Sequence, residues 1–169
     1  MALCPPLYSY ASPLGAIGYS FRGPGLWEIT LLPQEVSLLP QEACPPQAPP
    51  YSPQALRFAQ ALDSYFEGRL NALAPFMQLP PRGTPFQREV WQALAHIAPH
   101  QRQSYSGIAA LVGRPKAARA TGNAVGRNPL FLVLPCHRVL GADGALCGFA
   151  YGLEAKRWLL AHELRHRGG

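Results

Sequence analysis

Lysine and cysteine are scarce in this chain of 169 residues, and long hydrophobic runs are missing. No apolar stretch approaches the roughly 20 residues that a membrane-spanning helix needs, and the first residues lack the basic region and apolar core of a secretory signal. The four cysteines show no C-x-x-C spacing, and all five histidines lie in the second half, so neither a zinc site nor disulfides are supported. We expect a cytoplasmic protein with no membrane partner, no metal and no other cofactor.

The formal charge of +6 is unevenly spread along the chain. Residues 1–80 hold three arginines against five acidic residues, a net charge of −2, whereas residues 81–169 hold twelve basic residues against four acidic ones, a net charge of +8. Such an asymmetry indicates that the second half meets a polyanion. A solvated basic face without a partner is the simpler alternative.

The first 80 residues predict a small N-terminal α/β domain. Residues 15–22 and 26–32 have the mixed apolar and β-prone composition of two short strands. Residues 54–67 carry apolar side chains near helical spacing and predict an amphipathic helix.

Proline divides the chain. Eleven of the 19 prolines precede residue 54, and their density over 44–53 predicts a loop rather than regular structure. A second proline-rich stretch, 74–85, is the expected linker to a second domain, 81–169.

The second domain predicts mainly helices. Residues 86–98 place Phe86, Val90 and Leu94 on one helical face, and residues 153–167 predict a last helix. Between them, a helix with Ser104 as its N-cap ends at Gly113, and a second helix over 115–126 has Pro115 at its first position. Two helices joined by a short turn that carries glycine form the helix-turn-helix pattern of DNA-binding proteins.

The helix over 115–126 is unusual because its middle, "AARATG", consists of small residues around Arg119. Small side chains let a helix backbone lie close to another surface, which is either a neighbouring helix or a nucleic acid. The basic residues Arg114, Lys116 and Arg127 around it favour a DNA-facing helix.

The stretch "FLVLPCHRVLG", residues 131–141, ends an apolar run with a cysteine beside a histidine. A thiol becomes a strong nucleophile when a base removes its proton, and an imidazole is the usual base. The alternative is that Cys136 is one more small buried hydrophobe and His137 a satisfied surface histidine.

Four motifs together resemble the O6-alkylguanine-DNA alkyltransferases, proteins that accept an alkyl group from damaged guanine onto a cysteine. The motifs are "PCHRV", the Asn128-Pro129 dipeptide, "SYSGIAALVGRPKAARATGNAVGRNP" and "GLEAKRWLLAHE". The resemblance covers 86–163 nearly continuously and is weaker over 1–80. It implies a ribonuclease-H-like N-terminal domain and a mainly helical, winged-helix-like C-terminal domain that carries the active site.

The resemblance also implies roles for single residues. The intact cysteine separates this chain from the alkyltransferase-like relatives that have lost it. The implied catalytic residues are Cys136 as nucleophile and permanent alkyl acceptor, His137 as general base through a water, Glu163 as the carboxylate that orients it, Tyr105 as donor to guanine N3, Lys156 as electrostatic support and Asn128 as a structural brace.

The implied DNA contacts fit damage that occurs in any sequence, because the family's recognition helix enters the minor groove, whose code is degenerate. Arg119 would fill the space of a base turned out of the duplex. Other DNA contacts fall on Tyr105, Ser106, Arg114, Ala118, Ala120, Gly122 and Ala142. The pocket for the extruded base would be formed by Val139, Phe149, Ala150 and Tyr151.

The chain departs from the family pattern before Tyr105, where "PHQRQSY" lacks the glycine expected in the turn. Cys147, a second thiol near the substrate residues, is interpreted as structural.

The resemblance implies a monomeric repair protein whose partner is double-stranded DNA with an alkylated guanine. The protein would transfer the alkyl group irreversibly from O6-alkylguanine, with O4-alkylthymine as a further candidate substrate, and each chain would act once. Two other classes stay open: a cysteine hydrolase or amidotransferase that uses Cys136 and His137, and a non-enzymatic DNA-binding regulator or damage sensor.

Overall fold

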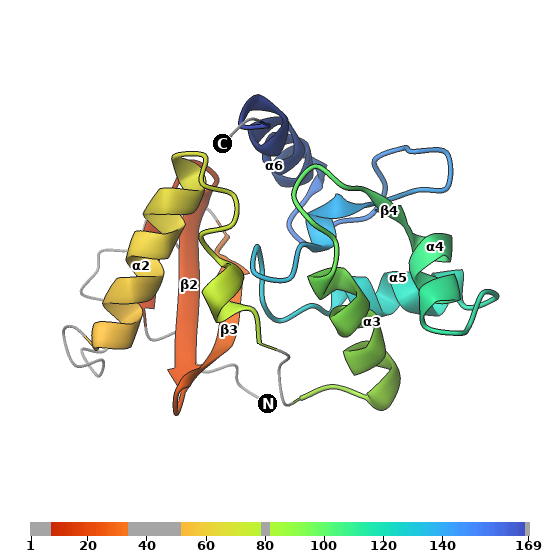
Figure 1. The fold of residues 1–169 in the computed structure, drawn as a ribbon, viewed down its shortest axis with the longest axis horizontal. Coiled ribbons are helices and arrows are strands. Elements are labelled where there is room, and N and C mark those ends of the chain that lie inside the picture. The colour runs from red at the N-terminus through yellow and green to blue at the C-terminus, as the bar shows by residue number, and fades with distance from the viewer. Residues whose placement is uncertain (1–7, 34–51, 79–81, 168–169) are drawn as a thin grey trace.

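The computed structural model describes residues 8–33, 52–78 and 82–167. Most of the predicted loop over 44–53 lies outside these residues. A small sheet with one helix packed beside it forms one side of the molecule, and a group of helices forms the other (Figure 1). Within the described residues, no helix is long and apolar enough to cross a membrane.

The sheet is an antiparallel meander of β1 (Tyr8–Ser12), β2 (Gly15–Arg22) and β3 (Gly25–Leu31). The two predicted strands are confirmed as β2 and β3, whereas β1 was not predicted. The burial of β1 alternates between half-buried and exposed residues, but none of its five residues is fully buried. The inward positions of YSYAS hold no strongly apolar residue, so the sequence lacks the alternation of apolar and polar residues that identifies a half-buried strand.

The helix predicted at 54–67 is confirmed as α2 (Pro53–Phe66). Ser52 caps it by accepting from the backbone N–H of Ala55, and Pro53 occupies the first turn, where its missing N–H costs nothing. Phe58 is buried against the sheet, with its ring centroid 5.0 Å from that of Tyr19 on β2. A short 3₁₀ turn, η2 (Ala74–Phe76), follows within the predicted linker.

Helix α3 (Pro85–Ala95) begins with a capping box, in which Thr84 and Gln87 exchange side-chain to backbone hydrogen bonds. Val90 and Leu94 are buried, as the periodicity predicted, whereas Phe86 is only half-buried. Trp91, next to Val90, is buried as well. The Trp91 indole donates to the carbonyl of Ala124, 2.9 Å away, and ties α3 to the helix behind it.

The helix pair is α4 (Tyr105–Leu111) and α5 (Ala118–Gly126). Ser104 caps α4 as predicted, and Gly113, with φ of 72°, ends it in the left-handed conformation that glycine tolerates. The predicted start of the second helix at Pro115 is wrong: Pro115 lies in a further turn, closed by the Ala117 N–H on the Arg114 carbonyl, and α5 begins three residues later.

The apolar run after Asn128 forms the centre of the molecule, since every residue from Leu130 to Val139 is buried. Its beginning pairs with the edge of β3, where Ile29 donates to the Pro129 carbonyl at 3.0 Å and Phe131 donates to the Ile29 carbonyl at 3.0 Å. The apolar core is consequently continuous between the two halves of the chain.

The run ends in η3 (Cys136–Arg138) and then β5 (Val139–Leu140), which pairs in parallel with β4 (Gln103–Ser104) just before α4. This pairing fixes the start of α4 next to the Cys-His dipeptide, and it places the helix pair beside the candidate nucleophile.

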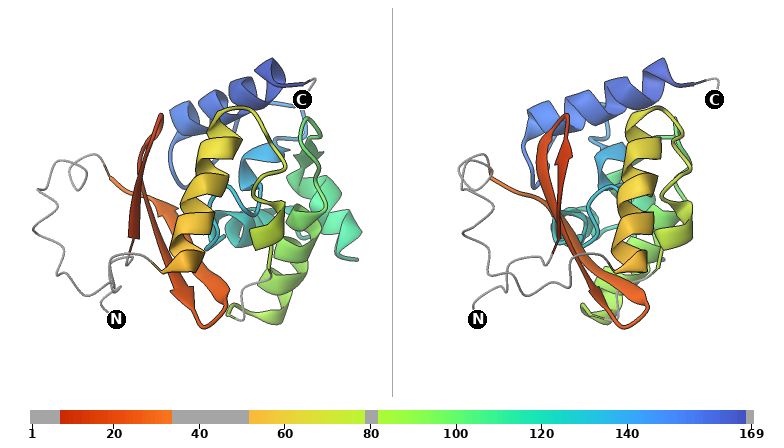
Figure 2. Two further views of the ribbon diagram at one scale, coloured as in Figure 1. Left: turned by 60° about the vertical axis from the view of Figure 1, so that its left-hand side comes forward. Right: turned by 90° about the vertical axis from the view of Figure 1, so that its left-hand side faces the viewer.

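The last helix, α6 (Leu153–Arg165), lies across the end of the sheet and of α2 (Figure 2). Leu159 is fully buried, and the His162 side chain is hydrogen bonded through Nε2 to the Tyr65 carbonyl of α2 at 2.9 Å. Trp158 and Phe66 add an aromatic contact between the two helices. The helix is thereby held in a fixed position behind the Cys-His dipeptide.

Candidate active site

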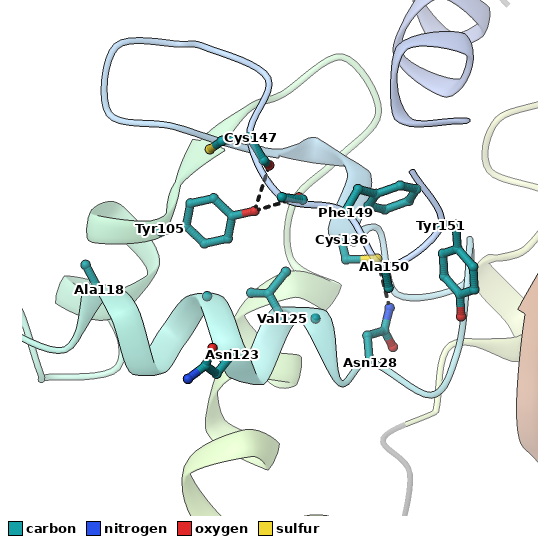
Figure 3. Close-up of a pocket in the computed structure, with 13 residues that line it drawn as sticks. Tyr105, Ala118, Asn123, Val125, Asn128, Cys136, Cys147, Phe149, Ala150 and Tyr151 are labelled. Carbon is teal, nitrogen blue, oxygen red and sulfur yellow. Dashed lines mark hydrogen bonds between the residues drawn. The ribbon is translucent and has the colours of Figure 1, made fainter. Parts of the chain in front are cut away.

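A cavity of about 410 Å³ opens between α5 and residues 141–152, which we call the substrate loop (Figure 3). The sulfur of Cys136 lies at its inner end, while α5 forms one wall and the substrate loop the other. The lining residues are Tyr105, Ala118, Gly122, Asn123, Val125, Gly126, Asn128, Cys136, Cys147, Gly148, Phe149, Ala150 and Tyr151.

Cys136 is almost fully buried and lies in η3, directly after Pro135. The Asn128 side-chain amide donates to its sulfur at 3.2 Å. Burial raises the pKa of the Cys136 thiol, whereas the Asn128 amide, nearby backbone N–H groups and the positive charge of Lys156 act to lower it. The thiol is therefore held protonated at rest, beside donors that stabilise a thiolate once its proton has left.

Asn128 holds the chain around the nucleophile in place. Its side-chain amide also donates to the Leu134 carbonyl at 2.8 Å, and its side-chain oxygen accepts from the Leu130 N–H at 2.9 Å. The turn between these residues contains Leu132 with φ of 67°, a left-handed conformation that is rare for leucine. One side chain thus fixes this strained turn and contacts the sulfur as well.

His137 is fully buried, and its Nε2 lies 2.8 Å from Oε1 of Glu163 on α6. Because Glu163 is ionised, Nε2 carries the proton and donates it to the carboxylate, so that Nδ1 presents a lone pair. Nδ1 is buried without a hydrogen bond to any described protein group. Burial lowers the pKa of His137 despite the nearby carboxylate, so the imidazole is neutral and ready to accept a proton.

Glu163 is fully buried but surrounded by cations. Arg138 donates through Nε to Oε1 at 2.7 Å, and Arg102 donates through Nη1 to Oε2 at 3.1 Å. Burial acts to raise the pKa of the Glu163 carboxyl, but the hydrogen bonds from His137 and Arg138 and the positive charge of Arg138 outweigh it and hold that pKa at about 2. The carboxylate stays ionised in the interior because it is fully paired.

Tyr105 and Lys156 both hold the substrate loop by its carbonyls. The Tyr105 hydroxyl donates to the carbonyls of Cys147 and Gly148 at 3.3 and 3.2 Å (Figure 3). Lys156 Nζ donates to the same two carbonyls at 2.8 and 3.3 Å. Burial raises the pKa of Tyr105 to about 12 and lowers that of Lys156. The tyrosine is therefore a neutral donor at the cavity wall.

Aromatic rings form the end of the cavity nearest the sheet. The Tyr151 ring centroid lies 4.6 Å from that of Phe131 and 5.6 Å from that of Phe149. The Tyr151 hydroxyl lies 3.4 Å from Oγ1 of Thr30 on β3 and so reaches the N-terminal half. Val139, the remaining predicted pocket residue, is buried in β5 and does not line the cavity, so its backbone contact stays a prediction.

The DNA contacts predicted on α5 lie on its open side. Arg119 and Ala120 are exposed, Ala118 and Gly122 border the cavity, and Thr121 turns inward. Arg119 has no hydrogen bond or ion pair with another described residue, so its exposed side chain is available to a ligand.

The three predicted phosphate contacts lie elsewhere on the surface. Ser106 and Ala142 are exposed, in α4 and the substrate loop. Arg114 is exposed as well, but it pairs with Glu89 at 3.3 Å and lies over the Phe86 ring.

Sequence reasoning missed several residues that the fold brings to the site. Asn123, Val125, Gly126 and Cys147 line the cavity, which only the helical position of α5 and the course of the substrate loop reveal. In the turn that lacks the expected glycine, His100 adopts φ of 67° in its place. No group of three or more potential metal ligands occurs within the described part of the chain.

Comparisons with known proteins agree with this geometry. Residues 85–165 match the family model described as 6-O-methylguanine DNA methyltransferase, DNA binding domain. The chain is 39% identical over 158 residues to the methylated-DNA–protein-cysteine methyltransferase of Mycolicibacterium paratuberculosis, a match that covers 92% of this chain and 90% of the relative. It is 52% identical over 102 residues to the protein of the same name from Salmonella typhimurium, and this match spans 60% of the chain but only 59% of that relative's length.

Solved structures show the same fold. The O6-methylguanine methyltransferase of Mycobacterium tuberculosis superposes with a TM-score of 0.73 at 33% identity, over 94% of this chain and 92% of that one. The structure of OGT from the same organism in complex with DNA gives a TM-score of 0.72 at 32% identity, over the same shares of the two chains.

The architecture is therefore the α/β fold of the O6-methylguanine methyltransferases, with the buried Cys136 beside a helix pair. The chain itself belongs to the methylated-DNA–protein-cysteine methyltransferase family, as its four motifs predicted.

Proposed function

We propose that this chain repairs DNA by moving an alkyl group from O6 of guanine onto Cys136, irreversibly and once per chain. The observation that carries the proposal is the position of the thiol. The Cys136 sulfur lies at the inner end of a cavity beside the helix pair, and the His137–Glu163 pair lies behind it. A nucleophile, a base and an orienting carboxylate are the parts of a general triad.

The transfer balances without a cofactor. The thiol proton passes to Nδ1 of His137 through a water molecule, the sulfur forms a bond to the alkyl carbon, and the bond from that carbon to O6 breaks. The electron pair stays on the guanine, which takes up a proton, so that overall the thiol proton replaces the alkyl group on the base. Glu163 stabilises the imidazolium in between, and the Asn128 amide stabilises the thiolate.

The product explains why each chain acts once. Alkylation turns the thiol into a thioether, which has neither the exchangeable bond of a disulfide nor the hydrolysable bond of a thioester. The buried position of Cys136 further protects the product.

The cavity walls offer donors where the leaving guanine develops negative charge. We infer that the Tyr105 hydroxyl exchanges its loop carbonyls for guanine N3, and that the backbone N–H near Ala150 meets O6. The carbonyls of Cys136 and Val139 would accept from the exocyclic amine. Lys156 supports the site by fixing the substrate loop and by its positive charge.

Duplex DNA hides O6 of guanine inside the base stack, so the base must be turned out to reach the cavity. The small residues on the open side of α5 fit close approach to the minor groove, and the free Arg119 fits the space that the base leaves. Ser106, Arg114 and the backbone near Ala142 would contact phosphates, which position the protein without reading sequence.

Finer features belong to the same proposal. We infer a boundary between domains 1–80 and 81–169, a ribonuclease-H-like arrangement of the first and a winged-helix-like arrangement of the second. A monomer in the cytoplasm, and O4-alkylthymine as a further substrate, complete the proposal.

Intact-protein mass spectrometry tests the proposed function directly. The wild-type chain is mixed with a duplex that contains one O6-methylguanine, and the same duplex with unmodified guanine is the control. The expected result is a gain of one CH₂ per chain, mapped by peptide analysis to Cys136, with no gain from the control duplex. No gain despite tight binding to the alkylated duplex would indicate a damage sensor. The absence of both the mass gain and the binding would favour a cysteine hydrolase.

Arg119→Ala is expected to slow alkyl transfer from duplex DNA about tenfold, because the space of the extruded base is no longer filled and the flipped state costs more. The rate with free O6-methylguanine base should stay unchanged, since no stack has to open. Both rates are read from the fraction of alkylated protein over time.

Arg57→Ala, which removes an exposed arginine from α2 in the other half of the chain, is the charge-matched control and should leave both rates alone. A loss of equal size on the free base would contradict the role of Arg119.

A further inference from the structure

The loop between α3 and α4, residues 96–102, lies against the outer side of the His137–Glu163 pair. It contacts Glu163 of this pair and the neighbouring Arg138 at three points. The Ile97 carbonyl accepts from Nη1 of Arg138, the His100 N–H lies 3.4 Å from Oε2 of Glu163, and Arg102 Nη1 donates to that same oxygen at 3.1 Å. This loop takes no part in the cavity itself.

We propose that Arg102 is a positioning residue for the alkyl transfer: it holds the second oxygen of Glu163 and thereby fixes the imidazole of His137. The inference rests on the proposed function, since it assigns a role within that reaction. It concerns a residue outside the motifs that identify the family.

The two oxygens of Glu163 have different partners. Oε1 is shared by His137 and Arg138, both of which are buried. Among the described residues, Arg102 is the side-chain partner of Oε2, and the backbone N–H of His100 adds a long contact. Without Arg102 the carboxylate would keep its Oε1 partners but lose the charge-assisted bond that prevents its rotation.

Arg102 also connects the pair to the helices that face the DNA. The next two residues, Gln103 and Ser104, form β4, pair with Val139 and Leu140, and lead into the N-terminus of α4. Tyr105 of the cavity wall follows directly. A shift of this segment therefore moves Arg102 and Tyr105 together. As a result, the general base His137 and the hydrogen-bond donor Tyr105 keep their position relative to each other.

Arg102 further affects the basicity of His137. The groups around the pair are Arg138 and Cys136 from η3, Lys156 and His162 from α6, Tyr65 from α2, and Arg102 and His100 from the loop. Burial lowers the pKa of His137 most, Glu163 raises it, and Arg138 and Arg102 lower it further. Removing the Arg102 charge should therefore raise the pKa of His137.

The test compares Arg102→Gln, Arg102→Lys and Arg82→Gln. Arg82 is the matched control, because it is also about one-third exposed and pairs with a glutamate, Glu28, away from the site. Three quantities are measured for each variant: the transfer rate at saturating alkylated duplex, the Kd for an unmodified duplex by fluorescence anisotropy, and the transfer rate as a function of pH.

Arg102→Gln is expected to lower the saturating rate about tenfold, since the base is less well placed. The acid limb of its pH profile should move to higher pH, because the rate requires neutral His137 and the pKa of that group has risen. Arg102→Lys, which keeps the charge, should restore most of the transfer rate and return the acid limb of the pH profile towards its wild-type position. Arg82→Gln should match the wild type, and the duplex Kd should be the same for all.

Two results would overturn the proposal. An unchanged rate and acid limb in Arg102→Gln would show that Arg102 has no part in positioning, and a weaker duplex Kd with an unchanged saturating rate would assign it to DNA binding instead. Failure of the wild-type chain to transfer any alkyl group would overturn the proposed function, and a normal wild type with a normal Arg102→Gln would overturn this inference alone.

Discussion

Cys136→Ser is expected to abolish alkyl transfer and to leave duplex binding intact. A serine hydroxyl is a far weaker acid than a thiol, so the neutral His137 cannot generate the alkoxide that attack would need. The replacement is close in size, and the Asn128 amide can donate to the oxygen as it does to the sulfur. Binding should persist because Cys136 lies at the inner end of the cavity and contributes no charge to the DNA-facing side.

The measurement is intact mass after incubation with the O6-methylguanine duplex, together with a binding curve for the same duplex. Cys147→Ser is the matched control, because Cys147 is the second thiol at the same cavity. It should still gain one CH₂ per chain. The assignment of the nucleophile fails if Cys136→Ser becomes alkylated or if Cys147→Ser is the variant that does not.

Glu163→Gln is expected to reduce both stability and transfer. The substitution removes a buried negative charge from between His137, Arg138 and Arg102, and it leaves the two arginines without their counter-charge. Breaking a buried ion pair on one side costs about 3 kcal/mol of unfolding free energy. Transfer should fall about 100-fold, since the imidazolium of His137 is no longer stabilised.

The pH dependence of stability gives a second readout. The pKa of Glu163 is about 2 in the folded protein, below its ordinary value of 4.5. A depressed carboxyl pKa contributes stability that is fully present above pH 4.5 and is lost as the pH falls towards 2. The wild type should therefore lose stability over this window, and Glu163→Gln should lose less over the same window.

Thermal and urea unfolding at a series of pH values measure both effects. Glu154→Gln serves as the control on the same helix, because Glu154 is exposed and, among the described residues, its ion-pair partner is Arg157 at the surface. Its stability should stay within about 0.5 kcal/mol of the wild type, as for most surface pairs. Equal losses in the two variants would show that the interior network does not stabilise the fold.

The elements that local sequence encodes were predicted well. Helix α2 follows from the spacing of its apolar residues, and α4 begins and ends at Ser104 and Gly113, as their capping and left-handed preferences require. These features depend on neighbours within a few residues. Strand β1 was not predicted, because its pairing with β2, rather than its own sequence pattern, makes it a strand.

The predicted start of α5 was wrong for a related reason. Proline is favoured at the first position of a helix, but it is equally at home in a turn. The chain after Gly113 turns once more, through the bond from the Ala117 N–H to the Arg114 carbonyl, before the helix begins. The course of the backbone around Gly113 decides whether Pro115 begins the helix or lies in a turn before it.

The sequence by itself determined the Cys-His dipeptide, which we propose as nucleophile and base, and the small-residue helix, because both patterns consist of adjacent residues. Only the tertiary structure decided how the site is completed. Arg102, His137 and Glu163 are brought within hydrogen-bond distance by the packing of α6 on α2 and of β4 on β5. A buried carboxylate requires partners wherever the fold can supply them, and those partners come from segments that no spacing along the chain connects.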